Sequence, residues 1–279
     1  PAGRRLASCY FTQKGQPLIP PLEQCFENGF LARGEYNPGG TRHYQYCTAF
    51  PIGTMLAQSW NTCLLQEVGA AVGYEMALFG VSLWLAPGMN IHRSPLCGRN
   101  FEYFSEDPLL SGQMAAAITR GVQSCPGCGV TLKHFACNNQ ETERLESNSL
   151  VSERALREIY LRGFQIAVQS AQPSAIMTSY NLVNGVHAAN SAALCTAIAR
   201  CEWGFAGIFM TDWDTTSSRR CTAEGCIQAG NDLLMPGNRR EYSALLCALR
   251  DGRLDRRLLR SCAGRIIKTA LGLSAPTAP

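Results

Sequence analysis

Short apolar runs alternate with longer amphipathic segments along most of this chain of 279 residues, and this alternation limits the fold more than any other feature. The short runs lack strict polar alternation, which is typical of strands that are buried on both faces. The predicted strands are residues 82–86, 129–133, 175–178, 207–211 and 232–235, with residues 50–53 as a sixth candidate.

Helical segments lie between the predicted strands, and capping residues support their ends. Asp107 stands before Pro108, a favourable N-cap followed by proline at the first helical position. Ser152 opens another helix, and Gly252 ends a third. The predicted helices cover about residues 62–79, 107–124, 153–170, 190–202, 240–250 and 255–271. Strand, crossover helix and strand in repetition predict a parallel sheet covered by helices.

Such a sheet is either a (β/α) barrel or an open, doubly wound sheet. A glycine-rich phosphate loop would favour the open sheet, but the chain has no such motif. Polar residues instead follow the strands, where the loops of a barrel converge, namely His92, Arg93, Lys133, His134, Ser179, Tyr180, Asn181, Asp212 and Trp213. We therefore predict an α/β fold with a TIM-type (β/α) barrel, incomplete because only five or six strands are recognisable. Residues 9–48 show no clear period and are interpreted as a long surface excursion.

Composition excludes several classes of protein. Lys and Arg number 25 against 21 Asp and Glu, and a net charge of +4 gives no basic footprint for nucleic acid or an anionic membrane. No apolar run approaches the ~20 residues of a membrane-spanning helix. The four histidines show no metal-ligand spacing, so we expect neither a metal nor another cofactor.

The 14 cysteines favour a reducing compartment. They are scattered through apolar segments, which suits buried, reduced thiols, for example Cys63, Cys137, Cys195, Cys247 and Cys262. The pair Cys125-Pro-Gly-Cys128 lies between a helix and a strand, so we interpret it as loop packing rather than as a thioredoxin-like motif. These features predict a cytoplasmic protein.

Asp212 is the strongest candidate for a catalytic residue. It follows the predicted strand 207–211 and precedes Trp213, so a carboxylate lies beside an aromatic ring, an arrangement suited to a sugar. A carboxylate nucleophile at a glycosidic carbon needs such a fixed position. The alternative is that Asp212 caps a following helix.

The other candidates have ordinary structural explanations as well. Lys133 ends a predicted strand and is either a Schiff-base nucleophile, as in an aldolase, or, with His134, a structural donor. Arg99 alone suggests an ion-paired loop residue. Arg144, close to several glutamates, suggests a solvated charged loop.

Several motifs occur in an order that resembles a known family. They include Leu85-Ala-Pro-Gly-Met-Asn-Ile-His-Arg93, Gly98-Arg-Asn-Phe-Glu-Tyr-Phe-Ser-Glu-Asp-Pro108, Lys133-His-Phe135, Met177-Thr-Ser-Tyr-Asn181 and Thr211-Asp-Trp213. Together they resemble the N-terminal barrel domain of glycoside hydrolase family 3, closest to its β-glucosidases. The resemblance implies a retaining, exo-acting β-glucosidase that forms a covalent glycosyl-aspartate on Asp212.

The same resemblance implies which residues bind the substrate, a small β-glucoside or oligosaccharide. They are Arg5, Arg99, Lys133, His134, Arg144, Tyr180 and Trp213, with Arg5 taken from a match of Pro1-Ala-Gly-Arg-Arg5 to a family segment. A dense set of donors is physically sensible, because a site built around hydroxyls rejects analogues that leave its groups unpaired.

Further expectations follow from the places where this sequence differs from the family pattern. Residues 1–272 are expected to be the barrel domain without its first strand, and residues 273–279 the start of an interdomain linker. The acid/base glutamate is expected on a C-terminal α/β domain outside this chain, so the chain alone should be weakly active or inactive. Members with an acid/base histidine carry a different loop from Lys133-His-Phe-Ala-Cys-Asn-Asn139, and Glu141, Glu143 and Glu146 are poor substitutes. A non-catalytic sugar-binding remnant is the main alternative.

Overall fold

In a computed structural model of the protein, the backbone is described for residues 5–12 and 41–273 and the side chains for residues 48–273. The chain divides into two compact units, Pro1–Pro51 and Ile52–Pro279. In the first unit, β1 (Arg5–Thr12) pairs antiparallel with β2 (Thr41–Thr48). The prediction of a surface excursion over residues 9–48 is therefore wrong at both ends. The missed signal is the β-forming residues at every second position of β2, which are Tyr44, Tyr46 and Thr48.

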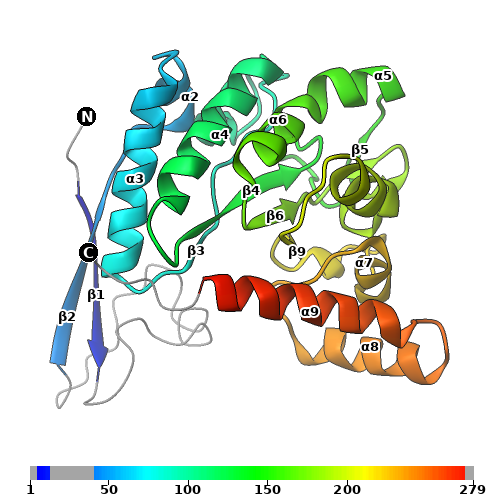
Figure 1. The fold of residues 1–279 in the computed structure, drawn as a ribbon. Coiled ribbons are helices and arrows are strands. Elements are labelled where there is room, and N and C mark those ends of the chain that lie inside the picture. Colours follow the sequence, from blue (N-terminus) through cyan, green and yellow to red (C-terminus); the bar gives the residue numbers. More distant parts are fainter. Residues whose placement is uncertain (1–4, 13–40, 274–279) are drawn as a thin grey trace. The chain divides into compact units, whose positions relative to one another are not determined.

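The second unit is built on a parallel four-stranded sheet with the order β3-β4-β6-β9 (Figure 1). Its strands are β3 (Leu83–Trp84), β4 (Gly129–Phe135), β6 (Ala175–Thr178) and β9 (Ile208–Thr211). The segments before and between them are helical, namely α3 (Thr62–Leu78), α4 (Pro108–Gln123), α6 (Arg162–Ala171) and η4 (Ala193–Glu202). The predicted (β/α) fold is confirmed, although over the described residues the sheet does not close into a barrel.

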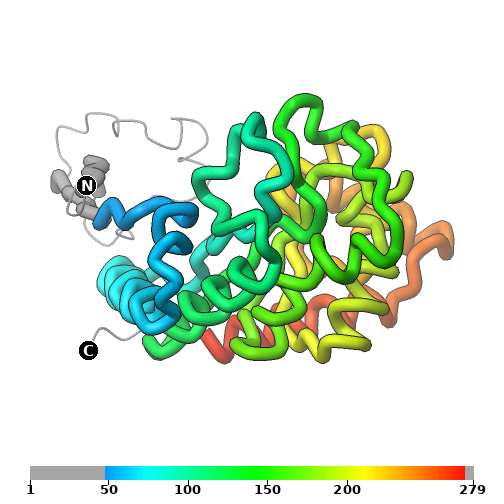
Figure 2. The backbone as a smooth tube through the Cα atoms, turned by 90° about the horizontal axis from the view of Figure 1, so that it is seen from above, coloured from blue at the N-terminus to red at the C-terminus, as the bar shows by residue number. Residues whose placement is uncertain are grey.

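Four further α-helices follow β9 or precede α3. They are α2 (Gly53–Ala57), α7 (Ala223–Ala229), α8 (Arg239–Arg250) and α9 (Arg256–Gly272). From α3 to α8 the helices succeed one another in sequence order across the second unit (Figure 2). The sequence did not predict α7, because only seven residues separate its N-cap Thr222 from Gly230, which ends it in the left-handed region. A small sheet joins β5 (Asn148–Ser149), β7 (Leu182–Val183) and β8 (Val186–His187).

Two predicted strands are corrected by the structure. Residues 50–53 form no strand, since α2 begins at Gly53, where a Cβ atom would lie only 2.7 Å from the backbone oxygen of Glu102. Residues 232–235 make one parallel bridge, from Leu233 to Met210. Beyond that bridge the ladder is irregular: the Thr211 hydroxyl accepts the backbone N–H of Met235, and the backbone oxygen of Met235 accepts the N–H of Asp214.

Two predicted helices are interrupted. The predicted helix over residues 153–170 is a short turn, α5 (Glu153–Ala155), then a π-helical turn, η2 (Leu156–Tyr160), and then α6. The predicted helix over residues 190–202 consists of a 3₁₀ turn, η3 (Ala188–Asn190), and the π-helical η4. The apolar period identified both helices but not these departures from the α-helical turn, tighter in η3 and wider in η2 and η4.

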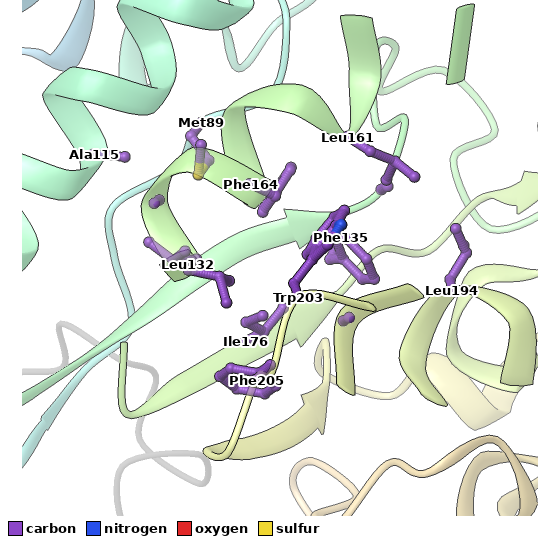
Figure 3. Packing of buried hydrophobic residues seen from close by; sticks show 14 of the residues in the cluster. Met89, Ala115, Leu132, Phe135, Leu161, Phe164, Ile176, Leu194, Trp203 and Phe205 are labelled. Carbon is purple, nitrogen blue, oxygen red and sulfur yellow. The ribbon is translucent and has the colours of Figure 1, made fainter. Parts of the chain in front are cut away.

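The end of β4 is anchored by aromatic packing in the core (Figure 3). The ring of Phe135 lies 5.2 Å from that of Phe164, 5.9 Å from that of Trp203 and 5.8 Å from that of Phe209, measured between ring centres. Phe135 and Leu132 are fully buried. The two residues between them, Lys133 and His134, are therefore held on a rigid strand end.

The cysteines divide between buried and exposed positions, and no described cysteine forms a disulfide. Cys137, Cys195 and Cys262 are buried as predicted, but Cys63 and Cys247 are exposed on α3 and α8, so that part of the prediction is wrong. Among the described residues, no helix has both the length and the apolar character that crossing a membrane requires.

Candidate active site

Seven of the eight predicted site residues line one cavity of about 300 Å³ at the carboxyl ends of β4, β6 and β9. They are Arg99, Lys133, His134, Arg144, Tyr180, Asp212 and Trp213, joined by Leu85 and Met177. Parallel strands bring their carboxyl ends to one edge, which is why residues so distant in sequence meet there. The eighth residue, Arg5, lies in the first unit, and its side chain is outside the described part of the chain.

Asp212 follows β9 directly and is 6% exposed. Its Oδ1 accepts the backbone N–H of Trp213 at 2.8 Å, whereas its Oδ2 has no hydrogen-bond partner. Burial raises the pKa of this carboxyl, against the opposing effects of the Trp213 N–H and the Arg99 charge. The helix-cap alternative is wrong, because the following 3₁₀ turn, η5 (Thr215–Ser217), has Asp214 at its N-cap position.

A chain of hydrogen bonds orients His134 against the free oxygen of Asp212. The Asn138 amide donates to the Tyr103 hydroxyl at 3.0 Å, so the Tyr103 proton is directed to His134 Nδ1, 3.1 Å away. His134 Nδ1 is then an acceptor, and the ring proton lies on Nε2, 3.5 Å from Asp212 Oδ2. Burial, followed by the charges of Arg99, Lys133 and Arg144, holds the pKa of His134 well below its usual range. The imidazole is therefore a neutral donor.

Two glutamates hold the basic residues of the cavity in place. Glu102 bridges two of them, with one carboxylate oxygen 2.5 Å from Arg99 Nε and the other 3.3 Å from Lys133 Nζ. Glu141 lies 2.7 Å from Arg144, whose guanidinium is stacked 4.4 Å from the centre of the Tyr180 ring. Arg99 and Arg144 are thus ion-paired loop residues and cavity residues at once.

Four residues of this network were absent from the predicted site: Glu102, Tyr103, Asn138 and Glu141. Glu102 and Tyr103 lie within the motif Gly98–Pro108, so their segment was recognised but not their contacts. The Arg99–Glu102 and Glu141–Arg144 pairs are three residues apart in sequence, whereas the contacts of Glu102 with Lys133 and of Tyr103 with His134 and Asn138 join distant segments, which no local pattern encodes.

Elsewhere among residues 52–273, neither a metal cluster nor the second cavity offers a comparable site. Within the described residues, no cluster of three or more His, Cys, Asp or Glu has the arrangement of a metal site. A cavity of about 560 Å³ lies between α7, α8 and α9 and is mainly apolar. Its two acids are committed to structure: Asp232 is paired with two arginines, and Glu241 forms the capping box of α8.

Comparison with known proteins identifies the family. The model of the glycosyl hydrolase family 3 N terminal domain matches residues 33–269. The chain belongs to this family. The resemblance inferred from the motifs is therefore confirmed.

The family 3 relatives are much longer than this chain. A beta-glucosidase of Ruminococcus albus is 44% identical over 248 residues, which are 85% of this chain and 26% of the relative. An exo-alpha-(1->6)-L-arabinopyranosidase of Bifidobacterium breve is 47% identical over 207 residues, 74% of this chain and 27% of that protein. The structure of beta-glucosidase 3B from Thermotoga neapolitana in complex with glucose matches with a TM-score of 0.77 at 47% identity, covering 80% of this chain and 32% of that one.

Proposed function

We propose that this chain carries the nucleophile and most of the sugar-binding residues of a retaining, exo-acting β-glucosidase. The observation that supports this most strongly is Asp212, whose Oδ2 is buried in the cavity without a hydrogen-bond partner. A buried polar atom without a partner is rare and calls for a functional explanation. The names of the family 3 relatives support a glycoside as the substrate.

In the proposed reaction, Oδ2 of Asp212 attacks the anomeric carbon and displaces the aglycone. A covalent glycosyl-aspartate forms, and water then hydrolyses it. Oδ1 remains fixed by the Trp213 N–H, so Oδ2 is the oxygen free to react. The neutral His134 faces Oδ2 without placing a full positive charge against it, which leaves the carboxylate nucleophilic.

The basic residues are proposed to bind the hydroxyls of the terminal sugar. Arg99, Lys133 and Arg144 present donors into the cavity, and their glutamate partners limit their movement. Trp213 is proposed as a surface for the sugar ring. A cavity of about 300 Å³ is at the small end of ligand sites, which favours a single terminal unit and thus exo action. Arg5 remains a proposed further contact.

A retaining mechanism also needs a second carboxyl about 5–5.5 Å from the nucleophile. Asp212 is the single carboxylic acid among the described residues that line the cavity. We therefore place the acid/base on a C-terminal α/β domain, with residues 1–272 as the barrel domain and residues 273–279 as the start of the linker. General acid–base help is typically worth ~10²–10⁴-fold, so the chain alone should hydrolyse natural glucosides slowly.

The test is covalent labelling with a 2-deoxy-2-fluoro glucoside that carries a dinitrophenyl leaving group, which departs without an acid. We expect one glucosyl adduct in the tryptic peptide of residues 201–219, located on Asp212 by fragmentation. A 2-fluoro arabinopyranoside run in parallel tests the specificity suggested by the Bifidobacterium relative.

The outcomes separate the alternatives. Sugar binding without any adduct supports the non-catalytic remnant, and an adduct on another carboxylate overturns the assignment of Asp212. The aldolase alternative is weakened by Glu102, because its carboxylate lies 3.3 Å from the Lys133 amine and holds that amine in an ion pair rather than free to attack a carbonyl. Borohydride trapping of Lys133 with a carbonyl compound would revive it.

A further inference from the structure

Two cysteines outside the proposed reaction face each other in the second unit. Cys221 precedes α7 and Cys226 lies within it, and their sulfur atoms are 3.6 Å apart without a disulfide. Cys221 is 4% exposed and Cys226 is fully buried. In the sequence, only a short segment separates Cys221 from the candidate nucleophile, Asp212.

The surroundings of the two sulfur atoms are polar. The Asn190 amide donates to Cys226 Sγ at 3.2 Å. His187 is 2% exposed, and its Nε2 has no hydrogen-bond partner. The hydrogen bond from Cys226, helped by His187, lowers the pKa of Cys221 to about 6 despite its burial. The same contact raises the pKa of Cys226, so Cys221 is the more acidic of the two thiols.

We propose that Cys221 and Cys226 form a redox-active dithiol that a hydroperoxide converts into a disulfide. The Cys221 thiolate attacks one oxygen of hydrogen peroxide, the O–O bond breaks, and the departing hydroxide takes a proton to become water. Cys226 sulfur then attacks the Cys221 sulfenic acid, the S–S bond forms, and hydroxide leaves with the Cys226 proton as a second water. Two thiols are oxidised and one peroxide is reduced.

The burial of Cys221 limits the size of the oxidant that can reach its sulfur. With 4% of Cys221 exposed, a protein disulfide or oxidised glutathione has no approach to the sulfur, whereas hydrogen peroxide is about the size of two water molecules. The geometry therefore points to a small hydroperoxide as the reactant and against thiol–disulfide exchange with a large partner.

The Cys125–Cys128 pair is an internal control with the opposite chemistry. The Cys128 thiol donates to the backbone oxygen of Gly73 at 3.4 Å, and burial raises its pKa to about 11. Its sulfur is thus engaged as a thiol in loop packing. A thiolate, not a thiol, attacks a peroxide, so this pair should react more slowly in the folded chain.

The two pairs fall in separate tryptic peptides, which makes the experiment direct. Residues 221–239 contain Cys221 and Cys226 as their only cysteines, and residues 121–133 contain only Cys125 and Cys128. The folded, reduced chain is treated with hydrogen peroxide, quenched with an alkylating agent, and digested. We expect peptide 221–239 to lose two hydrogen atoms and escape alkylation at least about threefold faster than peptide 121–133.

Three comparisons make the result decisive. In urea the preference should disappear, since the Cys125–Cys128 pair then closes the shorter loop. Oxidised glutathione at equal oxidising strength should leave peptide 221–239 reduced. In Cys226→Ser, dimedone added with urea after the peroxide treatment should trap a sulfenic acid on Cys221. Equal rates for the two peptides in the folded wild-type chain, or oxidation to sulfinic acid without a disulfide, would overturn the proposal.

Discussion

Two buried aspartates of the second unit, Asp212 and Asp232, differ in how their oxygens are used. Asp232 has a fully buried side chain, with one oxygen 2.7 Å from Arg265 Nε and the other 2.7 Å from Arg200. The second oxygen also accepts the backbone N–H of Phe209. Asp212 accepts one N–H on Oδ1 and has nothing within hydrogen-bonding geometry on Oδ2.

The difference separates a structural carboxylate from a reactive one. Every oxygen of Asp232 is committed, so its charge is compensated and it ties α9 and η4 to β9. Asp212 retains an oxygen that accepts no hydrogen bond in a cavity, which costs stability but leaves a lone pair for chemistry. The same substitution, aspartate to asparagine, should therefore act in opposite ways at the two positions.

The largest effect is expected on reactivity from Asp212→Asn. Because an amide oxygen is a poor nucleophile, the rate of labelling by the 2-fluoro glucoside should fall at least about 10⁴-fold. The variant should remain folded, and its far-ultraviolet circular dichroism is the control. Labelling at a rate near that of the wild type would remove the distinction between the two aspartates.

The next largest effect is expected on stability from Asp232→Asn. The neutral amide leaves Arg200 and Arg265 without their counter-charge, and breaking a buried ion pair costs about 3–5 kcal/mol. The free energy of unfolding in urea should fall by that amount, while the folded fraction should still be labelled at Asp212. A loss below about 1 kcal/mol would show that Asp232 is not a structural centre.

The sequence allowed the fold and most of the cavity to be predicted, because strand ends and motifs are local patterns. The apolar run before Asp212 marked β9, and the run before Lys133 marked β4. Parallel pairing of those strands then required their carboxyl ends to lie at one edge. The same reasoning singled out Asp212, which follows a predicted strand and precedes Trp213, but it gave no sign that Asp232, at the start of another predicted strand, is held between two arginines.

The features of the fold and of the site that the sequence did not predict depend on contacts between distant segments. Tyr103 reaches His134 from the loop after β3, and Asp232 finds its two arginines in η4 and α9. Residues 232–235 are predicted as a full strand because their apolar character is visible in the sequence. The bond from the Met235 N–H to the Thr211 hydroxyl is not. Satisfied and unsatisfied polar groups are properties of the folded chain, so no local pattern reports them.

A smaller effect, of about tenfold, is expected from Tyr103→Phe. The variant removes the hydroxyl that donates to His134 Nδ1, and a lost buried hydrogen bond costs about 1–3 kcal/mol. His134 should then sample both tautomers, which two-bond ¹⁵N–¹H spectra of a histidine-labelled sample report directly. Tyr74→Phe on the exposed face of α3 is the control and should change neither the spectrum nor the labelling rate. An unaltered Nε2–H tautomer in Tyr103→Phe would show that the Tyr103 hydroxyl does not orient the ring.

The smallest effect is the pH dependence that the buried carboxyl of Asp212 gives to folding. Because burial raises the pKa of this carboxyl above its unfolded value, the folded state holds the proton more tightly than the unfolded state. Wild-type stability should therefore fall as pH rises from the unfolded carboxyl range, about 3.9, through the raised value, and the loss should remain at neutral pH. Asp212→Asn lacks this ionisation, so it should be about 0.5–2 kcal/mol more stable than the wild type at neutral pH and nearly equal in acid. Urea unfolding of both proteins across this range measures the difference. A constant difference at every pH would mean that the Asp212 charge is compensated in the fold, as that of Asp232 is.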